Sequence, residues 1–445
     1  MTSSVPAGDP VMNFRRGTPE APSAPSPDSI SPTSPESRVD LIDIVRGFAL
    51  FGVFLGNIVW TSQDFGLTDG QREALSSAAW DECARALVLI FIDKKFYTLF
   101  SILFGLGFAL QLSRAAARGQ DVLPVYVRRL AVLLVIGITH GFLLWFGDIL
   151  QIYAIAGFGL ILFRSRKDRT VLVWCVALAV VTALLPLADW AAGGTAPPEV
   201  EGETKAMRFA AITGNRWMDV IRMNAAFQYD FYGHLDLRAD ENIYWFLAVF
   251  WKFLLGFFIG RRLLLQQAER HLPLFRRVLP WALAAGLAGN ALWLAFEAGA
   301  LGESPPLIAA LWIPIEIGIL GLSLAYLSAL VLLFQRPAWK QRLSLLAPVG
   351  RMALTNYLAQ SVLIVAVFYG VGLGLMGKIG AALCIPIAIL LFAVLTAVSR
   401  WWLGRFRFGP AEWLWRSLTY GRAQPLRASV TAAALPKGAP RGPRS

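Results

Sequence analysis

The chain has 445 residues, of which 56% are hydrophobic and only 16% are charged, and its formal net charge is +12 at pH 7. Soluble proteins carry about 25% charged residues, so this composition excludes an ordinary soluble domain and indicates a polytopic membrane protein. The basic groups show no aromatic interleaving on a soluble face. Nucleic acid is therefore not expected as a partner, and membrane lipid is.

The first 37 residues are rich in Pro, Ser and charge, and no apolar stretch follows Arg15 and Arg16. This pattern predicts a disordered cytoplasmic tail rather than a signal peptide. Residues 423–445 are similar and predict a second, basic tail. Because no internal repeat is evident, a single transmembrane domain is expected over 38–422, with an extracytoplasmic loop at 190–243.

Ten apolar runs fill this domain, and each is near the length of about 20 residues that a helix needs to cross a bilayer. They lie at 41–60, 96–113, 128–147, 149–164, 170–189, 244–264, 277–298, 306–334, 352–374 and 380–402. Lys and Arg cluster in alternate connections, at 113–129, 164–169, 260–277 and 334–342. The positive-inside rule then predicts an all-α bundle of about ten transmembrane helices, with both termini in the cytoplasm.

The first run, "RVDLIDIVRGFALFGVFLGNIVW", carries Asp43, Arg46 and Asn57. Asp43 and Arg46 are three residues apart and share a helix face, and Asn57 returns to nearly that face about 16 Å further along. Such a stripe usually faces the bundle interior or a water-filled cavity. Alternatively, Asp43 and Arg46 mark the helix start at the membrane interface, and Asn57 makes an interhelical hydrogen bond.

The stretch "GITHGFLLWFGDILQIY" places His140 and Asp148 in an otherwise apolar segment. If the helix continues to the hairpin, His140 lies up to about 12 Å deeper than Asp148. A neutral imidazole there can pass on a proton at physiological pH, and Gly137 and Gly141 leave room for a helix or a ligand. Alternatively, His140 is a structural histidine on a main-chain carbonyl, and Asp148 caps the next helix.

Five other polar residues lie in or near apolar runs. Glu316 needs a partner or a proton at membrane depth, and Asn356 and Gln360 share a helix face that favours helix–helix hydrogen bonds. Lys94 and Lys95 are expected as interface anchors, unless one of them faces an anionic ligand. No metal site is expected, because the three histidines would have to come from both sides of the membrane.

Several segments, in this order, resemble the YeiB-like family of bacterial membrane proteins, also called domain of unknown function 418. They are "RVDLIDIVRGFALFGVFLGNI", "KFYTLFSILFGLGFALQLSR", "RRLAVLLVIGITHGFLLWFGDILQIYAIAGFGLILFR", "GRMALTNYLAQS" and "RFGPAEWLWRSLTYGRAQPL". The resemblance covers residues 38 to about 426. It implies a multi-pass protein of the bacterial cytoplasmic membrane and assigns no reaction.

The opening helix is also similar to that of transmembrane acyltransferases, namely the acyltransferase-3 enzymes and heparan glucosaminide N-acetyltransferase. The shared pattern is D-x-x-R-G followed by a polar residue, here Asp43, Arg46, Gly47 and Asn57. The resemblance implies that a membrane-embedded histidine activates a sugar hydroxyl or amine, and that an acyl-CoA donor reaches the site from the cytoplasm.

This chain departs from that pattern, because Asn57 stands where acyltransferase-3 proteins have His, and residues 58–95 contain no histidine. If the chemistry is retained, the resemblance implies that His140 is the general base. Asp148 or Asn57 would then position His140, and Arg46 would hold the donor phosphate. Loss of the catalytic residue is the other interpretation of the same departure.

The sequence therefore favours an acyltransferase-like membrane protein that modifies a cell-envelope glycan or lipid. The expected catalytic residues are His140 and Asp148, and the expected substrate or donor residues are Asp43, Arg46 and Asn57. No metal or resident cofactor is implied, and acyl-CoA would be a donor substrate. A transporter or exporter whose polar stripe lines a permeation path, and a non-catalytic scaffold, are the alternatives; the oligomeric state is left open.

Overall fold

The computed structural model describes residues 40–427 except 66, 68, 76–78, 120, 192–201, 233–240 and 302–303. The chain divides into Met1–Ser37 and Arg38–Ser445, and every described residue belongs to the second unit. The tail predicted at 1–37 and residues 428–445 lie outside the described residues. The described part is all-helical, and its one β-bridge joins Phe406 and Arg427, which confirms the predicted class.

The α-helices, in chain order, are α1 (Asp40–Trp60), α2 (Asp69–Leu75), α3 (Ala79–Phe91), α4 (Lys95–Ala116), α5 (Leu123–Leu143), α6 (Leu150–Leu160), α7 (Asp168–Ala191), α8 (Gly202–Thr213), α9 (Trp217–Tyr232), α10 (Glu241–Arg261), α11 (Leu272–Glu297), α12 (Pro305–Phe334), α13 (Pro337–Leu343), α14 (Ala347–Arg351), α15 (Ala353–Phe368), α16 (Ala381–Leu403) and α17 (Pro410–Tyr420). Four short helices, η2 to η5, join some of them, at Thr61–Phe65, Ile161–Phe163, Ala268–His271 and Ser344–Leu346.

All ten apolar runs contain a helix, but fewer than ten of the described helices are long and apolar enough to cross a membrane. Seven of the described helices are long and apolar enough to cross a membrane. The pair Pro337–Arg351 and Ala353–Phe368, bent by 82°, makes an eighth if it is one span, and Leu150–Phe163 is a shorter apolar helix. The protein is thus a multi-pass membrane protein with seven or eight such helices, and the predicted count of ten is not confirmed.

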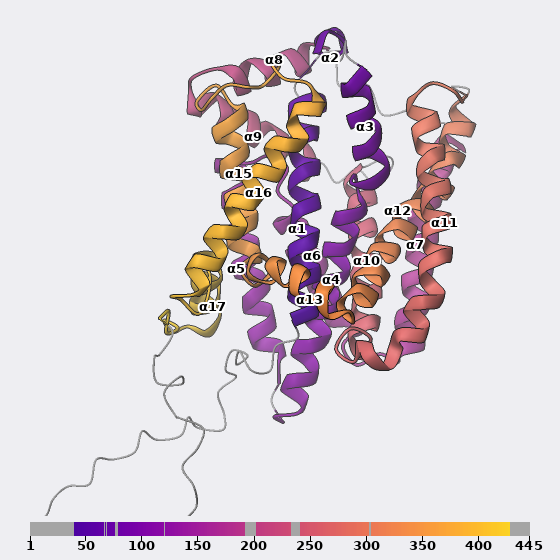
Figure 1. The fold of residues 1–445 in the computed structure, drawn as a ribbon, viewed down its shortest axis with the longest axis vertical. Coiled ribbons are helices and arrows are strands. Elements are labelled where there is room, and N and C mark those ends of the chain that lie inside the picture. Colours follow the sequence, from indigo (N-terminus) through magenta and orange to yellow (C-terminus); the bar gives the residue numbers. More distant parts are fainter. Residues whose placement is uncertain are drawn as a thin grey trace, which may run out of the picture. The chain divides into compact units, whose positions relative to one another are not determined.

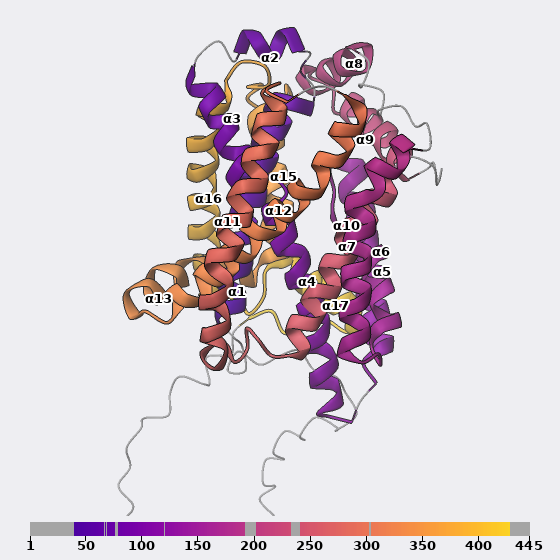
Figure 2. The same ribbon diagram turned by 90° about the vertical axis from the view of Figure 1, so that its right-hand side faces the viewer.

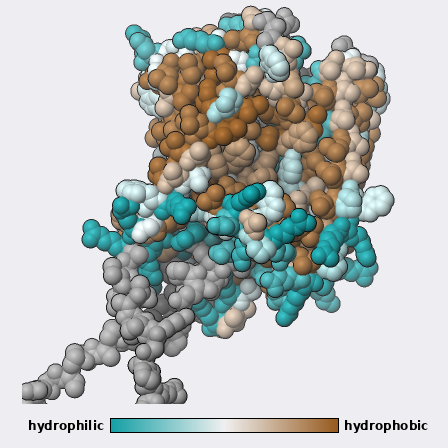
Figure 3. All heavy atoms as spheres, viewed as in Figure 1, coloured by the Kyte–Doolittle hydropathy of each residue, from teal (hydrophilic) through white to brown (hydrophobic). Residues whose placement is uncertain are grey.

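The long helices run side by side, and the short helices gather at the two ends of the bundle (Figures 1 and 2). Helices α2, α8 and α9 lie at one end, and α13 and α17 lie at the other. We call the second the basic end, because α13 lies there with Lys340 and Arg342. Figure 3 shows a broad hydrophobic band above a belt of hydrophilic residues at the basic end, as expected of a protein that spans a bilayer.

Close contacts at glycine hold the central helices together. A Cβ added at Gly47 of α1 would lie 2.2 Å from the carbonyl oxygen of Leu346, and one added at Gly350 of α14 would lie 1.9 Å from that of Asp43. Helices α4 and α10 meet in the same way at Gly105 and Gly256. Because small residues allow backbones to approach, such contacts fix helix positions where lipid provides no hydrophobic driving force.

Candidate functional site

His140 and Asp148 form a buried pair between α5 and α6. Nδ1 of His140 lies 2.8 Å from Oδ1 of Asp148, and the two side chains are only 3% and 0% exposed. The second carboxylate oxygen, Oδ2, accepts the main-chain N–H of Gln151 at 3.0 Å, in the first turn of α6. Asp148 thus serves both neighbouring helices, since it holds the imidazole of α5 and caps the start of α6.

The pair forms because α5 ends earlier than the sequence predicts. The expected helix ran to residue 147, which would separate the two groups along the axis, whereas α5 ends at Leu143. The N–H groups of Leu144 and Trp145 both donate to the carbonyl oxygen of His140, so the chain leaves the helix just after the histidine. The turn then returns Asp148 to the level of His140.

Two glycines on α5 make room for this turn. A Cβ at Gly137 would lie 2.8 Å from the main-chain nitrogen of Gln151 and 2.9 Å from Oδ2 of Asp148. A Cβ at Gly141 would lie 2.5 Å from Nε2 of Gln151. The glycines that flank His140 therefore admit the neighbouring hairpin, which is one of the two roles expected for them.

Helices α15 and α9 close the site. The hydroxyl of Tyr357 on α15 donates to Oδ1 of Asp148 at 3.4 Å and accepts the N–H of Ile149 at 3.1 Å. From α9, the amide of Gln228 donates to the carbonyl oxygen of Phe146 at 2.8 Å and accepts from Nε2 of Gln151 at 2.7 Å. Helix α9, part of the segment predicted to be extracytoplasmic, thus covers the pair from the end opposite the basic end.

The arrangement leaves one nitrogen of His140 available for chemistry. The short contact with a carboxylate assigns the Nδ1 proton to the hydrogen bond with Asp148, which leaves Nε2 as an acceptor. Nε2 is buried, and among the described residues it has no hydrogen-bond partner. A carboxylate that fixes the tautomer and an imidazole with a free acceptor together form the arrangement that general-base catalysis requires.

Asp43 and Arg46 form a separate group. Nη1 of Arg46 lies 2.8 Å from Oδ1 of Asp43, and it also donates to the carbonyl oxygen of Gly350 at 3.3 Å. The guanidinium side chain is 26% exposed, whereas the carboxylate is buried. These contacts attach the first turns of α1 to α14, beside the glycine contact described above.

Asn57 belongs to a third group, between α1 and α4. Its Oδ1 accepts the hydroxyl of Tyr97. The hydroxyl of Tyr153 on α6 donates to the carbonyl oxygen of Tyr97 at 3.2 Å and lies 2.7 Å from the hydroxyl of Ser101. The structure therefore brings His140 and Asp148 together, but it joins neither to Asp43, Arg46 or Asn57 by a direct hydrogen bond among the described residues.

Glu316 on α12 has partners that the sequence analysis did not name. Its carboxylate accepts the hydroxyl of Tyr244 on α10, and Lys95 and Lys252 lie within electrostatic range. Lys252 is 92% buried, since only 8% of its surface is exposed. A lone lysine inside the run "AVFWKFLLGFF" is a visible signal of a buried charge, and it was overlooked.

Lys94 and Lys95, expected as interface anchors or as partners of an anionic ligand, both lie beside tryptophan rings. Lys94 has a left-handed backbone (φ 59°), and its Nζ lies 4.5 Å from the ring centroid of Trp312. Lys95 is fully buried, its Nζ lies 4.8 Å from the ring centroid of Trp293, and it donates to the carbonyl oxygen of Leu89 at 2.5 Å. A ring face and a carbonyl oxygen replace water around the ammonium group of Lys95, whereas Lys94 is only partly buried.

Tyr357, Gln151 and Gln228 are the other residues that the sequence analysis missed. Tyr357 stands in "TNYLAQS" beside the noted Asn356, and Gln151 follows Asp148 at the spacing of a helix cap. Asn356 and Gln360 themselves bond to neighbouring helices, at Ser399 and at the carbonyl oxygen of Leu50. Both residues therefore make interhelical hydrogen bonds, as their spacing favoured.

The fold and this site define a class: an all-helical, multi-pass membrane protein with a buried histidine–aspartate pair between two adjacent helices. Residues 259–422 match the family described as "Protein of unknown function (DUF418)". The chain belongs to this YeiB-like family, because similarity to its members extends over most of the chain.

Two relatives show this extent. The uncharacterized protein YxaH of Bacillus subtilis (strain 168) is 32% identical over 411 residues, which cover 86% of this chain and 94% of YxaH. The uncharacterized protein YeiB of Escherichia coli (strain K12) is 29% identical over 414 residues, which cover 86% of this chain and 96% of YeiB. The predicted family is thus confirmed.

Proposed function

We propose that the protein is a membrane acyltransferase in which His140 is the general base and Asp148 positions it. The substrate class is a hydroxyl or amine of a cell-envelope glycan or lipid, and the donor is an acyl-CoA. The observation that carries the proposal is the buried pair itself, in which Nδ1 is 2.8 Å from a carboxylate and Nε2 is an acceptor without a partner in the described part of the chain.

The acyl transfer needs no proton donor or acceptor other than His140 and the two substrates. Nε2 of His140 takes the proton of the acceptor hydroxyl or amine as that atom attacks the thioester carbonyl carbon. The carbon–sulfur bond then breaks, and the imidazolium returns the proton to the thiolate, which yields the acylated acceptor and free CoA. Asp148 stabilises the imidazolium throughout, as a buried carboxylate does for a catalytic histidine.

The resemblance of the first helix to transmembrane acyltransferases gives Asp43, Arg46 and Asn57 a place in the same proposal. Arg46 is partly exposed near the start of α1, and in this proposal it binds donor phosphate, for which a guanidinium is well suited. Its bond to the carbonyl oxygen of Gly350 would have to be exchanged for the phosphate. Asn57, farther along the same helix, would bind the substrate or the donor.

We further propose that the basic end and both termini face the cytoplasm of a bacterial inner membrane, with ten membrane crossings. The alternation of basic loops supports this orientation, and the bacterial relatives support this membrane. In this arrangement α4, α6 and α15 cross together with the seven helices that are long and apolar enough to cross a membrane by themselves. The His140–Asp148 pair would then lie nearer the outer face.

The test uses purified full-length protein and acetyl-CoA as the probe. Binding is measured by calorimetry, and release of free thiol is measured with a thiol reagent, for the wild type, His140→Gln and Thr139→Val. Thr139 is the matched control, because it neighbours His140, is exposed, and bonds only to the carbonyl oxygen of Val135 in its own helix. We expect thiol release to fall at least about 100-fold in His140→Gln and to persist in Thr139→Val.

Two outcomes contradict the proposal. Wild-type protein that neither binds acetyl-CoA nor releases thiol has no acyl donor of this class. Equal rates for the wild type and His140→Gln would remove the histidine from the reaction even if the donor is bound.

A second candidate function, transport, is favoured by a different observation. Broken helices at membrane depth often hold the substrate in transporters, and α3 and α4 are separated by a turn at residues 92–94 where Lys94 has a left-handed backbone. The cluster around Glu316 lies beside that break. Flux of a labelled anion in proteoliposomes, lost in Lys252→Gln, together with no covalent product, would favour transport over acyl transfer.

A further inference from the structure

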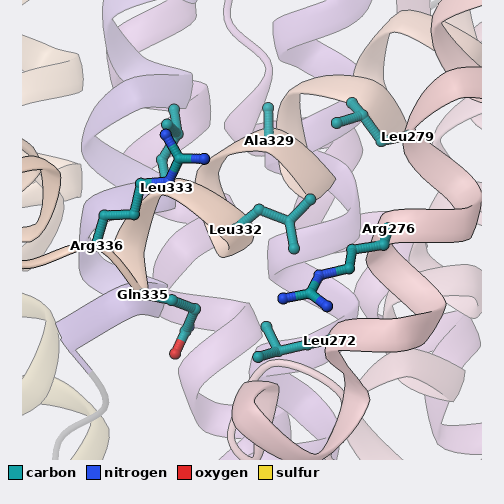
Figure 4. A pocket seen from close by; sticks show the side chains of 8 residues that line it. All are labelled: Leu272, Arg276, Leu279, Ala329, Leu332, Leu333, Gln335 and Arg336. Atoms are coloured by element: carbon teal, nitrogen blue, oxygen red, sulfur yellow. The ribbon is translucent and has the colours of Figure 1, made fainter.

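A groove between α11 and α12 lies at the basic end, away from the His140–Asp148 pair. Its volume is 480 Å³. It is lined by Leu272, Arg276, Leu279, Ala329, Leu332, Leu333, Gln335 and Arg336. Figure 4 shows Arg276 reaching from α11 toward Leu332, with Arg336 beyond the last turn of α12.

The groove is built from one face of each helix. On α11, Leu272, Arg276 and Leu279 recur at intervals of four and three residues, which places them on one side. On α12 and the residues after it, Ala329, the two leucines 332 and 333, and Arg336 recur at the same intervals. Farther along, the two helices meet closely, since a Cβ at Gly289 would lie 2.3 Å from the carbonyl oxygen of Pro314.

The charge of the groove is uncompensated. No carboxylate lines it, and among the described residues neither Arg276 nor Arg336 takes part in a side-chain hydrogen bond or an ion pair. The five apolar lining residues are four leucines and one alanine. Two guanidinium groups at the rim of an apolar groove match a molecule with an anionic head and hydrocarbon chains.

We expect the groove to lie at the depth of a lipid headgroup. Helix α13 follows Arg336 directly and carries Trp339 and Lys340, and Figures 1 and 2 show it lying beside the bundle at the basic end. Trp and Lys side chains are enriched at membrane–water interfaces. The arginines are therefore expected at the interface, and the leucines are expected to extend from it into the hydrocarbon region.

We propose that this groove is a binding site for one anionic phospholipid of the leaflet at the basic end. Arg276 and Arg336 hold the phosphate, and an acyl chain lies over Leu279, Leu332 and Ala329. The bound lipid joins α11 to the end of α12 and so stabilises the α11–α12 pair. This site is independent of the chemistry proposed for His140.

The experiment compares two double variants that lose the same charge. Purified, delipidated full-length protein is titrated with short-chain phosphatidylglycerol or phosphatidylcholine, and the bound fraction is measured by native mass spectrometry. Arg276→Gln with Arg336→Gln removes both groove cations, whereas Arg277→Gln with Arg342→Gln removes two nearby cations that do not line the groove. Ala329→Phe fills the groove and leaves its charge unchanged.

We expect the wild type to bind phosphatidylglycerol at least about tenfold more tightly than phosphatidylcholine. The groove double variant should lose this preference, Ala329→Phe should lose most of the binding, and the control pair should retain both. Equal losses in the two double variants would overturn the proposal in favour of diffuse surface charge. Wild-type binding in Ala329→Phe, or displacement of the lipid by glycerol phosphate alone, would overturn it as well.

Discussion

At the scale of single residues, Asp148 has two separable roles, because one oxygen faces His140 and the other caps α6. Asp148→Asn keeps an acceptor for the N–H of Gln151 but removes the charge that stabilises an imidazolium. If the proposed reaction is correct, thiol release from acetyl-CoA should fall at least about tenfold, a loss of about 1.4 kcal/mol in barrier terms, with little change in melting temperature.

Asp148→Ala removes both roles. Comparison with Asp148→Asn therefore separates the contribution of the helix cap from that of the charge. Loss of the cap costs about 1 kcal/mol, and a buried Nδ1–H of His140 without an acceptor costs about 1–3 kcal/mol more. Its melting temperature in detergent should therefore lie clearly below that of Asp148→Asn. Equal melting temperatures in the two variants would show that Asp148 does not cap α6.

The sequence identified His140 and Asp148 as candidates but could not predict their contact. Whether they touch depends on where α5 ends, and a difference of four residues along a helix is about 6 Å. Helix ends are set by local hydrogen bonds, here those of Leu144 and Trp145 to His140, and an apolar run gives no signal for them. Partners from distant segments, such as Tyr357 and Gln228, could not be predicted either, because their contacts depend on how the helices pack.

At the scale of elements, the α5–α6 hairpin should depend on Gly137. Gly137→Ala places a methyl group 2.8 Å from the main-chain nitrogen of Gln151, so the hairpin must move, at a cost of about 1–3 kcal/mol. Gly107→Ala on α4 is the matched control, because nothing lies within 4 Å of its added Cβ.

Thermal unfolding in detergent tests this difference. The control should be as stable as the wild type or more so, since alanine favours a helix over glycine. Gly137→Ala should unfold at a lower temperature and should lose activity along with it. An unfolding temperature of Gly137→Ala equal to that of the wild type would mean that the hairpin can move away from the added methyl group at no cost.

Glu412 ties α17 to the start of α15. Its Oε1 accepts the N–H groups of Leu354 and Thr355 at 2.6 and 3.1 Å, and its Oε2 accepts the hydroxyl of Thr355 at 2.5 Å. A carboxylate at a helix N-terminus satisfies free donors and the helix dipole together. Glu412→Ala should therefore lower stability by about 2–4 kcal/mol.

Glu412→Gln should fall between the wild type and Glu412→Ala, because the amide oxygen still accepts while the charge is lost. Melting temperatures of the three proteins in one detergent give the order. An alanine variant as stable as the wild type would show that water replaces the carboxylate at no cost.

At the scale of the whole molecule, the orientation can be tested with cysteines. In a Cys83→Ser background, Cys175 and Cys384 are buried. Gln341→Cys lies on α13 at the basic end, and Arg216→Cys lies between α8 and α9 at the other; both positions are exposed. If the basic end is cytoplasmic, a membrane-impermeant maleimide added to intact cells stripped of any outer membrane should label position 216 alone.

Permeabilised cells provide the control, because both positions should then react. Labelling of position 341 in the intact cells would invert the proposed orientation. It would also place the His140–Asp148 pair nearer the cytoplasm and would remove the reason for an envelope acceptor.

The overall architecture was largely predictable, because long apolar runs are sufficient to identify membrane helices in a sequence. All ten apolar runs are helical, and their bounds differ from prediction by a few residues at most ends. The number that cross was not predictable, since runs such as 149–164 and 352–374 give helices that are short or bent. Burial of Lys95 and Lys252 was likewise hidden, because hydropathy does not show which aromatic rings will surround a lysine.

The amide contacts of α9 have a kinetic consequence. Asn224 and Gln228 together make three side-chain hydrogen bonds to the α5–α6 hairpin. At about 1 kcal/mol each, these bonds alone oppose undocking of the helix by on the order of 3 kcal/mol, and burial of Val220 adds to this, so fewer than about 1% of molecules are open at any moment. The imidazole would then be shielded from bulk solvent between encounters, and the frequency of undocking would set an upper bound on turnover.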